Sequence, residues 1–285
     1  MPTKLLLIVC FFSGGVVFGQ SKYATTGVFR FIEKLPIGSD YEVGPGQLSK
    51  GSDKLLLGLT TGNIEKQDSL WSDLYYIDLQ NTGAGPKAIA LPNDLDSIQY
   101  FQCTSSENEE VIVYVTNEYG GWNDNQLGIA YKDQNGSYNR ARPLSEINSN
   151  ALSDAYPWLS ADGLRLYYCR DFKIFVTGRK NIQDPFAAPT PVYFNGEVHL
   201  DVVSCWLTPK EDIMYIIANN NIYISYKDKK TSAFSLPQLF SDAFKNFYFI
   251  ASLSFAADKK TMYIYYSDEF EQSILKYELV QGKAW

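Results

Sequence analysis

The sequence predicts an all-β protein, a five-bladed β-propeller with four-stranded antiparallel blades. One pattern of short strands and turns recurs five times, at intervals of 48 to 56 residues, and this period is typical of propellers and repeat arrays. The two ends of the chain are also complementary, because one end carries a strand that the other lacks. Aromatic residues make up 15% of the chain, which suits an all-β fold because aromatic rings pack well on pleated sheets.

The repeat is clearest at residues 154–180, DAYPWLSADGLRLYYCRDFKIFVTGRK. Residues 156–160 predict a first strand. Asp162-Gly163 then predicts a two-residue hairpin turn with Gly163 at positive φ, because this dipeptide tolerates such a backbone. Residues 164–170 and 173–179 predict the second and third strands, in which alternate side chains face opposite sides of the sheet.

The other units align with this one. An apolar residue ends the first strand of each unit, at Leu48, Cys103, Leu159, Leu207 and Phe255. Another apolar residue follows eight positions later, at Leu56, Val111, Tyr167, Tyr215 and Tyr263. Third strands are predicted at 74–79, 127–131, 174–177, 222–226 and 274–279. Proline-containing segments at 142–144, 188–194 and 236–240 predict outer fourth strands, where the unpaired edge tolerates proline.

The N-terminal segment 27–37 resembles these fourth strands, and the last unit has no such segment of its own. We therefore expect the N-terminal strand to complete the last blade and close the ring. Closure removes the exposed strand edges that an open array would leave. It also sets the number of blades at five. The alternative is six blades, if residues 23–40 formed a further, degenerate blade.

The turn sequence carries a family resemblance. PWLSADGLRLYY, followed by KIFVTGR, resembles the TolB-type propeller repeat, a WD40-like repeat with an apolar-Ser-x-Asp-Gly turn before an aliphatic-aromatic strand. Leu207-Thr208-Pro209 and Ala257-Asp258-Lys259 keep parts of this pattern, and the first two units lack its Asp-Gly core. The resemblance covers residues 40–285 and implies a propeller scaffold. It leaves function open because such scaffolds serve many functions.

Residues 1–19 predict a secretory signal peptide. Lys4 provides the positive charge, the apolar run after it is too short to span a bilayer, and residues 17–19 suit cleavage. Residues 20–285 then form a single β-propeller domain that is exported to the periplasm or the cell exterior, without membrane insertion. Loss of Lys4 takes the formal charge from −7 to −8, and this acidity argues against nucleic acid as a partner.

The sequence offers little catalytic chemistry. His199 is the only histidine, and neither a G-x-S-x-G elbow nor a C-x-x-C pair occurs, so no cofactor or metal is expected. Cys103, Cys169 and Cys205 lie in apolar strand patterns, which predicts buried free thiols, with one disulfide as the alternative.

Acidic residues stand where the first strands begin. First strands line the central channel of a propeller, and an acid begins the strand in four units: Asp40 or Glu42, Asp96, Asp154 and Asp201, with Asn246 in the fifth. Such acids can cap backbone amides of the connecting loops. They can also form a polar channel mouth, and glycoside hydrolases use pairs of carboxylates in this way.

The connections between second and third strands fall on the same face, because the strands alternate in direction. They are short in two units, at Asp171-Phe172 and at 219–221, and long in the first two, at 61–72 and 117–125. The long connections contain Trp71, Tyr119 and Trp122, which suit recognition of a protein or glycan if exposed. Alternatively, the two tryptophans fold back onto the blades.

We therefore expect an exported, non-enzymatic propeller that acts as a protein-binding or envelope-assembly module. The expected partner is another envelope protein or a glycan. The ligand-binding residues predicted for this face are Glu42, Asp96, Asp154, Asp201, Trp71, Tyr119 and Trp122. A carbohydrate-binding protein or a five-bladed glycoside hydrolase is the alternative.

Overall fold

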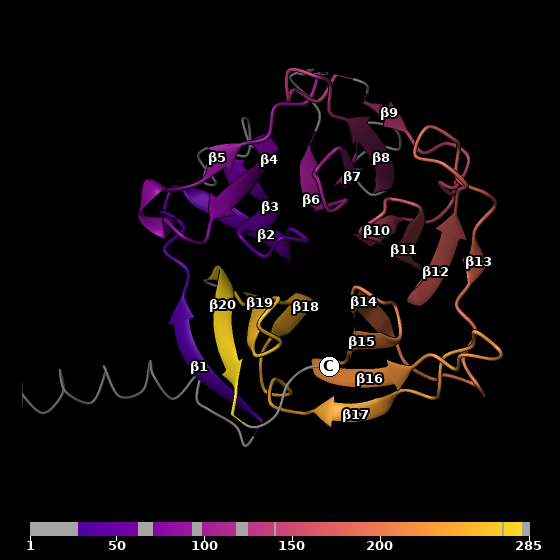
Figure 1. Cartoon of the computed structure of the whole chain (residues 1–285). Coiled ribbons are helices and arrows are strands. Elements are labelled where there is room, and N and C mark those ends of the chain that lie inside the picture. Colours follow the sequence, from indigo (N-terminus) through magenta and orange to yellow (C-terminus); the bar gives the residue numbers. More distant parts are fainter. Residues whose placement is uncertain are drawn as a thin grey trace, which may run out of the picture.

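Five four-stranded antiparallel sheets stand as blades around one central axis, as Figure 1 shows along that axis. The structure is a computed structural model, and it describes residues 28–61, 71–92, 99–117, 125–139, 141–269 and 271–280. The predicted all-β, five-bladed propeller is confirmed. Within the described ranges, no helix has the length and hydropathy of a membrane span.

The inner strand of each blade lies nearest the axis (Figure 1). These strands are β2 (Tyr41–Leu48), β6 (Tyr100–Ser105), β10 (Asp154–Leu159), β14 (Val202–Leu207) and β18 (Phe249–Phe255). We call the face at which they begin the N face, and the face at which they end the C face. Because neighbouring strands are antiparallel, turns between second and third strands lie on the N face, and hairpins between first and second strands lie on the C face.

The second and third strands form the middle of each blade. The second strands are β3 (Lys54–Thr61), β7 (Val111–Thr116), β11 (Arg165–Arg170), β15 (Ile213–Ala218) and β19 (Thr261–Ser267). The third strands are β4 (Trp71–Asp78), β8 (Gln126–Tyr131), β12 (Lys173–Gly178), β16 (Asn221–Tyr226) and β20 (Gln272–Leu279). They agree with the predicted positions to within a few residues.

The outer strands are short. They are β5 (Lys87–Ala88), β9 (Arg142–Pro143), β13 (Thr190–Pro191), β17 (Gln238–Ser241) and, in the last blade, β1 (Phe29–Lys34). A 3-10 turn, η2 (Thr82–Ala84), precedes β5. Prolines stand at two of these edges because an edge strand has N–H positions that need no partner within the sheet.

The hydrophobic core lies between blades, since each blade buries both of its faces. In β3, Leu55, Leu57 and Leu59 pack towards the last blade, whereas Leu56 packs towards the second. In β7, residues Val111, Val113 and Val115 pack towards the third blade. Strands buried on both faces have nearly continuous apolar sequences. Within the described ranges, all three cysteines are buried and free, as their positions in apolar strands predicted.

The close approach of the first two blades requires glycine at position 58. A β-carbon on Gly58 of β3 would stand 2.3 Å from the carbonyl oxygen of Phe101 in β6. Only a residue without a side chain allows the first two blades to meet there.

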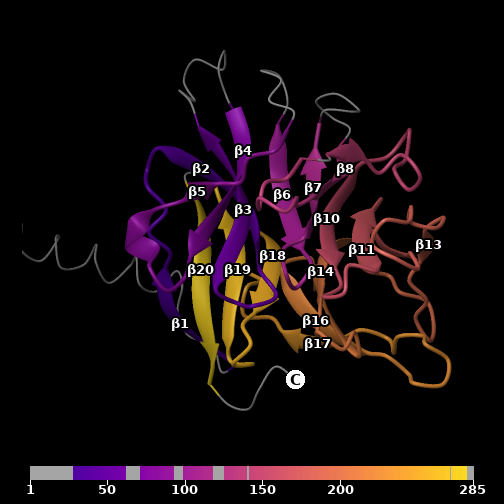
Figure 2. The same ribbon diagram turned by 45° about the horizontal axis from the view of Figure 1, so that its top comes forward.

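The ring closes through the first and last strands of the described chain. β1 pairs antiparallel with β20, with Phe29 opposite Leu279 and Lys34 opposite Leu275, and the two strands lie side by side in Figures 1 and 2. Phe29 is fully buried, and its ring packs against Phe244 at 5.7 Å between centroids. The predicted closure is confirmed, and the last blade has no open outer edge at β20.

The hairpin between first and second strands has one geometry in all five blades. In the third blade, Gly163 N–H donates to the Ser160 carbonyl at 2.9 Å, and Ser160 N–H donates to the Arg165 carbonyl at 2.8 Å. Gly163 has the predicted positive φ, of 70°. The predicted two-residue turn is wrong, because Ala161 and Asp162 occupy its centre and Gly163 follows as the left-handed residue. The matching residues elsewhere are Ser52, Glu109, Glu211 and Lys259, all at φ between 55° and 62°.

Truncation of the closing strand tests its contribution to stability. Phe29→Ala should lower the free energy of unfolding by about 3–5 kcal/mol, because it removes a fully buried ring. Ile32→Ala in the same strand is the control, since its side chain is 42% exposed and it should change stability by less than about 1 kcal/mol. Urea unfolding measures both. Equal effects would show that closure does not depend on the packing of Phe29.

The left-handed residue of the turn gives a second prediction. Gly163→Ala should destabilise the protein by about 1 kcal/mol, because its positive φ is costly for any residue with a β-carbon. The space itself is sufficient, since the nearest atoms would be 3.7 Å away. Gly83→Ala is the matched control, with no atom within 4 Å and no positive φ. A thermal melt in which the two variants behave alike contradicts the backbone explanation.

Candidate functional site

A cavity opens on the N face, between the third, fourth and fifth blades. Its volume is about 380 Å³. The residues that line it are mostly apolar: Leu152, Ser153, Ala155, Tyr156, Cys169, Arg170, Asp171, Phe172, Val202, Val203 and Phe249. We call this opening the N-face cavity. Two of its apolar side chains reach into solvent, since Leu152 is 42% exposed and Phe172 is 62% exposed.

Phe172 stands in a backbone conformation that disfavours it. Arg170 pairs with Lys173, so Asp171 and Phe172 alone form the turn, at φ of 49° and 57°. Turns of this kind require left-handed residues and prefer Asn, Asp or Gly. For a residue with a bulky side chain this conformation costs roughly 1–2 kcal/mol. Hydrophobic burial offsets little of this cost, because the Phe172 ring is 62% exposed.

The fourth blade shows the same turn with suitable residues. There Asn219 and Asn220 take φ of 48° and 56°, and Asn220 also ties the turn to the next blade. Its side-chain amide donates to the Phe247 carbonyl at 2.7 Å, and its oxygen accepts from Ile250 N–H at 3.1 Å. Phe172 makes no comparable side-chain bond. Stability therefore does not explain a phenylalanine at this position, and such strain in an exposed residue points to function.

Asp154, the predicted acid of the third blade, is fully buried at the start of β10. Its carboxylate accepts from Arg170 Nε at 2.6 Å and Nη2 at 2.9 Å, and from Ser149 N–H at 2.9 Å. Arg170 in turn donates to the Ile147 carbonyl and packs over the Phe175 ring. This network fixes the loop that leads into the blade and forms one wall of the N-face cavity.

The other predicted acids have different surroundings. Glu42, in β2, is half-buried and accepts from the Gln272 side chain of the last blade. Asp201 precedes β14 and is exposed beside Val202 of the cavity. Asp96 lies outside the described residues. The neighbours Ala155 and Val202 line the N-face cavity, whereas Asp154 and Asp201 themselves do not. Glu42 lies at the contact between the first and last blades.

Most of the aromatic residues predicted for the site lie outside the residues that the structure describes. Tyr119 and Trp122 fall on residues that the structure does not describe. The backbone of Trp71 starts β4, opposite Thr61, which in turn lies opposite Tyr41 at the start of β2. The backbone of Trp71 is thus at the N-face end of the first blade, close in register to Glu42.

Phe172 was not among the site residues predicted from the sequence. The Asp171-Phe172 connection was expected to be short, and this expectation was confirmed. A two-residue turn between antiparallel strands needs left-handed residues, so an aromatic residue within it was the available signal. Leu152 and Val203 gave no such signal, because only the arrangement of three blades brings them together.

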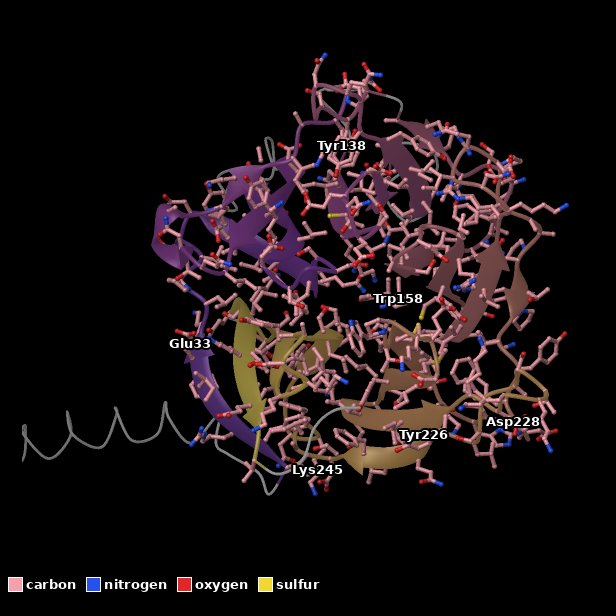
Figure 3. The ribbon with its side chains drawn as sticks, in the orientation of Figure 1. Glu33, Tyr138, Trp158, Tyr226, Asp228 and Lys245 are labelled. Carbon is pink, nitrogen blue, oxygen red and sulfur yellow. The ribbon has the colours of Figure 1, made fainter. Side chains whose placement is uncertain are left out.

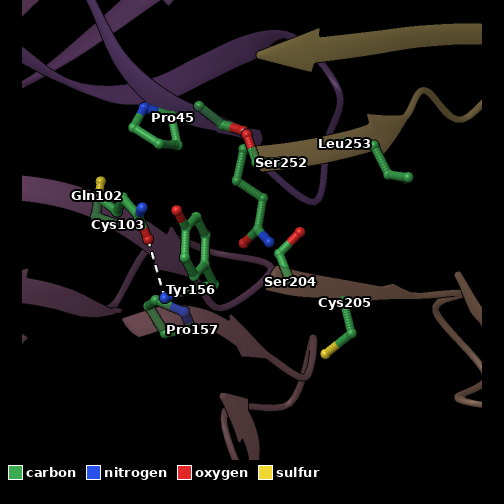
Figure 4. A pocket seen from close by; sticks show the side chains of 11 residues that line it. Pro45, Gln102, Cys103, Tyr156, Pro157, Ser204, Cys205, Ser252 and Leu253 are labelled. Atoms are coloured by element: carbon green, nitrogen blue, oxygen red, sulfur yellow. Dashed lines mark hydrogen bonds between the residues drawn. The ribbon is translucent and has the colours of Figure 1, made fainter. Parts of the chain in front are cut away.

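Below the N-face cavity, the central channel narrows to a space of about 20 Å³. All five inner strands contribute to its lining, including Gln102, Tyr156, Ser204 and Ser252 (Figure 4). Each inner strand has a bulge at this level, which re-aims side chains towards the axis. Tyr156 N–H donates to Gln102 Oε1 at 3.0 Å between neighbouring blades. This polar belt joins the inner strands and leaves no passage for a ligand.

Five carboxyl groups of the described chain have shifted pKa values, and none of the five lines the N-face cavity. The pKa of each of these carboxyl groups is lowered, namely Glu146, Asp162, Asp228, Asp242 and Asp258. Hydrogen bonds to these carboxylates outweigh the opposing effect of burial where that is present. Among the described residues, no cluster of three or more His, Cys, Asp and Glu side chains could hold a metal ion.

The known structures that resemble this chain are propellers of several kinds. A luciferin-regenerating enzyme matches with a TM-score of 0.54 and 10% identity, over 90% of this chain and 97% of its own. A putative gluconolactonase matches with a TM-score of 0.52 and 8% identity, over 90% and 94%. A putative TolB from Agrobacterium tumefaciens matches with a TM-score of 0.50 and 13% identity, over 81% and 72%. No protein-family model and no curated protein matches the sequence.

These similarities define a class of fold. At such low identity they support a TolB-like β-propeller and carry no activity over to this chain. These proteins include enzymes as well as a putative TolB, so function has to be argued from the site itself.

The buried ion pair between Asp154 and Arg170 predicts that Asp154 and Asp201 differ in their contribution to stability. Asp154→Ala should lower the free energy of unfolding by about 3–5 kcal/mol, because it leaves the Arg170 guanidinium without its carboxylate in a buried setting. Asp201→Ala should change stability by less than about 0.5 kcal/mol, since this carboxylate is exposed. Chemical denaturation of both variants measures the difference. Similar losses in the two would rule out a special structural role for Asp154.

Proposed function

We propose that this chain is an exported, non-enzymatic propeller of the TolB-like, WD40-like kind that binds another envelope protein at its N face. In this proposal the N-face cavity receives an apolar side chain of the partner, and Phe172 is the anchor at its rim. Truncation of an aromatic anchor at the centre of an interface typically costs about 2 kcal/mol or more of binding free energy.

The observation that carries the proposal is Phe172 itself. Its ring is 62% exposed and stands beside a cavity of about 380 Å³, on a backbone that favours Asn or Gly. A partner that covers the ring would recover the hydrophobic free energy that the free protein lacks. Leu152 is exposed beside the same cavity and extends the apolar contact.

The charges around the cavity indicate what the partner carries. Asp171 and Asp201 are both exposed, and Arg170 is already paired with Asp154. The rim therefore carries two exposed carboxylates and one exposed lysine, Lys173, which follows Phe172, and the chain as a whole has a formal charge of −7. A partner segment with an apolar residue flanked by lysine or arginine complements it.

Glycan binding or glycoside hydrolysis remains the second candidate, and the site favours it less. A hydrolase needs two carboxylates that face each other across the substrate. Of the three acids near the N-face cavity, Asp154 is held by Arg170 and by Ser149 N–H, which leaves Asp171 and Asp201. A glycan array and a panel of aryl glycosides test this candidate directly, and binding or turnover there would replace the protein-partner proposal.

Export is part of the proposal and has its own test. It rests on the sequence of residues 1–19, with Lys4 and the short apolar run after it. Expression in a bacterial host, followed by fractionation and mass spectrometry of the N-terminus, should find the mature chain outside the cytoplasm and shortened near Gln20. An intact N-terminus in the cytoplasm would overturn the assignment.

The anchor role of Phe172 predicts a separation of binding from stability. Phe172→Asn should weaken partner binding by about thirtyfold or more, which corresponds to the loss of one aromatic anchor. Its melting temperature should stay the same or rise, because asparagine suits the left-handed turn. Tyr226→Asn, on a peripheral aromatic residue that is 49% exposed (Figure 3), should leave binding unchanged.

The partner for this measurement comes from site-directed cross-linking. A photoreactive phenylalanine analogue at position 172 should capture an envelope protein that the same analogue at position 226 does not. Calorimetry then compares the captured protein with the wild-type chain and both variants. The proposal fails if position 172 captures nothing specific, or if Phe172→Asn binds the captured protein as well as the wild type.

A further inference from the structure

A second cavity opens between the first and second blades, near the C face and away from the central axis. Its volume is about 300 Å³, at the lower end of the range for small-molecule sites. Leu56 and Tyr76 line it from the first blade, and Ile112 and Tyr138 line it from the second. Tyr138, labelled in Figure 3, lies on the outer side of the ring. We call this opening the interblade cavity.

The first blade lacks a tyrosine that the last three blades bury. The eighth residue after the end of the inner strand is a buried tyrosine in those blades, at Tyr167, Tyr215 and Tyr263. Between the third and fourth blades, the Tyr167 hydroxyl donates to the Glu211 carboxylate at 3.1 Å. The first blade has Leu56 at this position, and Glu109 takes the place of Glu211. Leu56 leaves the space beside Glu109 open, and both residues line the cavity.

Ser105 is the polar exception among the residues that end the inner strands. β6 ends at Ser105, two residues beyond the Cys103 that the sequence pattern indicated, and its counterparts are Leu48, Leu159, Leu207 and Phe255. Ser105 stands opposite Ile112 in the ladder, and both line the cavity. It is 1% exposed, and among the described residues its hydroxyl has no hydrogen-bond partner. Such a buried hydroxyl is costly, so its place in a cavity wall points to a ligand that supplies the partner.

The charges that line the cavity leave one cation in excess. Lys54 Nζ donates to both carboxylate oxygens of Glu109, at 2.7 and 2.8 Å, so these two charges compensate each other. Lys132 Nζ lies 3.5 Å from the same carboxylate, which is longer than a good hydrogen bond. Among the described residues that line the cavity, these two lysines face one acid, which gives a net charge of +1. The chain as a whole is acidic, so this local excess favours an anionic group on the ligand.

We propose that the interblade cavity binds a small aromatic carboxylate that carries a hydroxyl group. The aromatic ring occupies the space beside Leu56 that a tyrosine fills in other blades. The hydroxyl group enters first and pairs with Ser105, which is buried. The carboxylate stays at the rim and accepts from Lys132, whose side chain is 26% exposed.

This site is independent of the N-face cavity. The N-face cavity lies between the last three blades, whereas the interblade cavity lies between the first two, towards the opposite face. A small ligand in the interblade cavity therefore leaves Phe172 free for a protein partner.

Calorimetry on the full chain tests the class of ligand. The probe para-hydroxyphenylpropanoate should bind saturably, at one site per chain. Phenylpropanoate lacks the hydroxyl group and should bind about threefold or more weakly, because one hydrogen bond to Ser105 is lost. Tyramine carries an ammonium in place of the carboxylate and should bind at least about tenfold more weakly, because its charge has the same sign as that of Lys132.

Three variants locate the site. Ser105→Leu introduces the leucine that ends three other inner strands, so it should abolish binding of para-hydroxyphenylpropanoate. Its melting temperature should not fall, because the change removes a buried hydroxyl without a partner. Lys132→Met should weaken binding about tenfold or more, through loss of a hydrogen bond to a charged group. Lys173→Met is the control, since it removes an exposed charge from the N face and should leave binding unchanged.

Ser105→Ala separates recognition from folding. It removes the hydroxyl group and leaves the cavity open, so para-hydroxyphenylpropanoate and phenylpropanoate should then bind with equal affinity. Three results each overturn the proposal. They are the lack of saturable binding of para-hydroxyphenylpropanoate up to about 5 mM, equally tight binding of tyramine, and a preference for the hydroxylated probe that persists in Ser105→Ala.

Discussion

Ring closure is the constraint on which the rest of the structure depends. Four of the blades complete their sheets with consecutive strands, but the last blade ends at β20 and takes its outer strand from the opposite end of the described chain. Without β1, the N–H and C=O groups along one edge of β20 would be free to pair with other chains. Ion pairs along the two strands, such as Lys34–Glu271, are partly exposed and contribute little. The buried ring of Phe29 and the backbone ladder therefore hold the closure together.

A closed ring brings the inner strands close to one axis, and this proximity shapes the channel below the N-face cavity. The bulge shared by all five inner strands turns polar side chains inwards at one level, where Ser252 Oγ donates to the Gly46 carbonyl at 2.9 Å between the last and first blades. The belt narrows the channel to about 20 Å³. The N-face cavity therefore does not continue through the axis to the C face.

Conformational strain is distributed unevenly over otherwise equivalent turns. Five hairpins on the C face place one residue each in the left-handed region, and only the third blade uses glycine there. Glu211 adopts this left-handed conformation and, from its buried position, accepts hydrogen bonds from Arg165 and Tyr167. These hydrogen bonds offset the cost of its backbone strain. The Phe172 side chain, on the N face, makes no hydrogen bonds that would offset its strain. The two positions show the same backbone geometry serving internal packing in one case and, in our proposal, recognition in the other.

The sequence by itself determined the class of fold, the number of blades and the closure of the ring. These features follow from local patterns that repeat, namely alternating apolar strands, turn residues and a spare edge strand, and each pattern needs only its neighbours in the chain. The sequence also placed Asp154 at the start of its inner strand and Asp201 one residue before the next inner strand, but did not indicate their surroundings. Burial of Asp154 against Arg170 depends on how the loop packs onto the blade, and the exposure of Asp201 depends on the next blade. Only the tertiary structure decided the two cavities, since residues from two or three blades line each one. Lys54 and Lys132 are distant in sequence and belong to different blades, so no local pattern could have placed both beside Glu109.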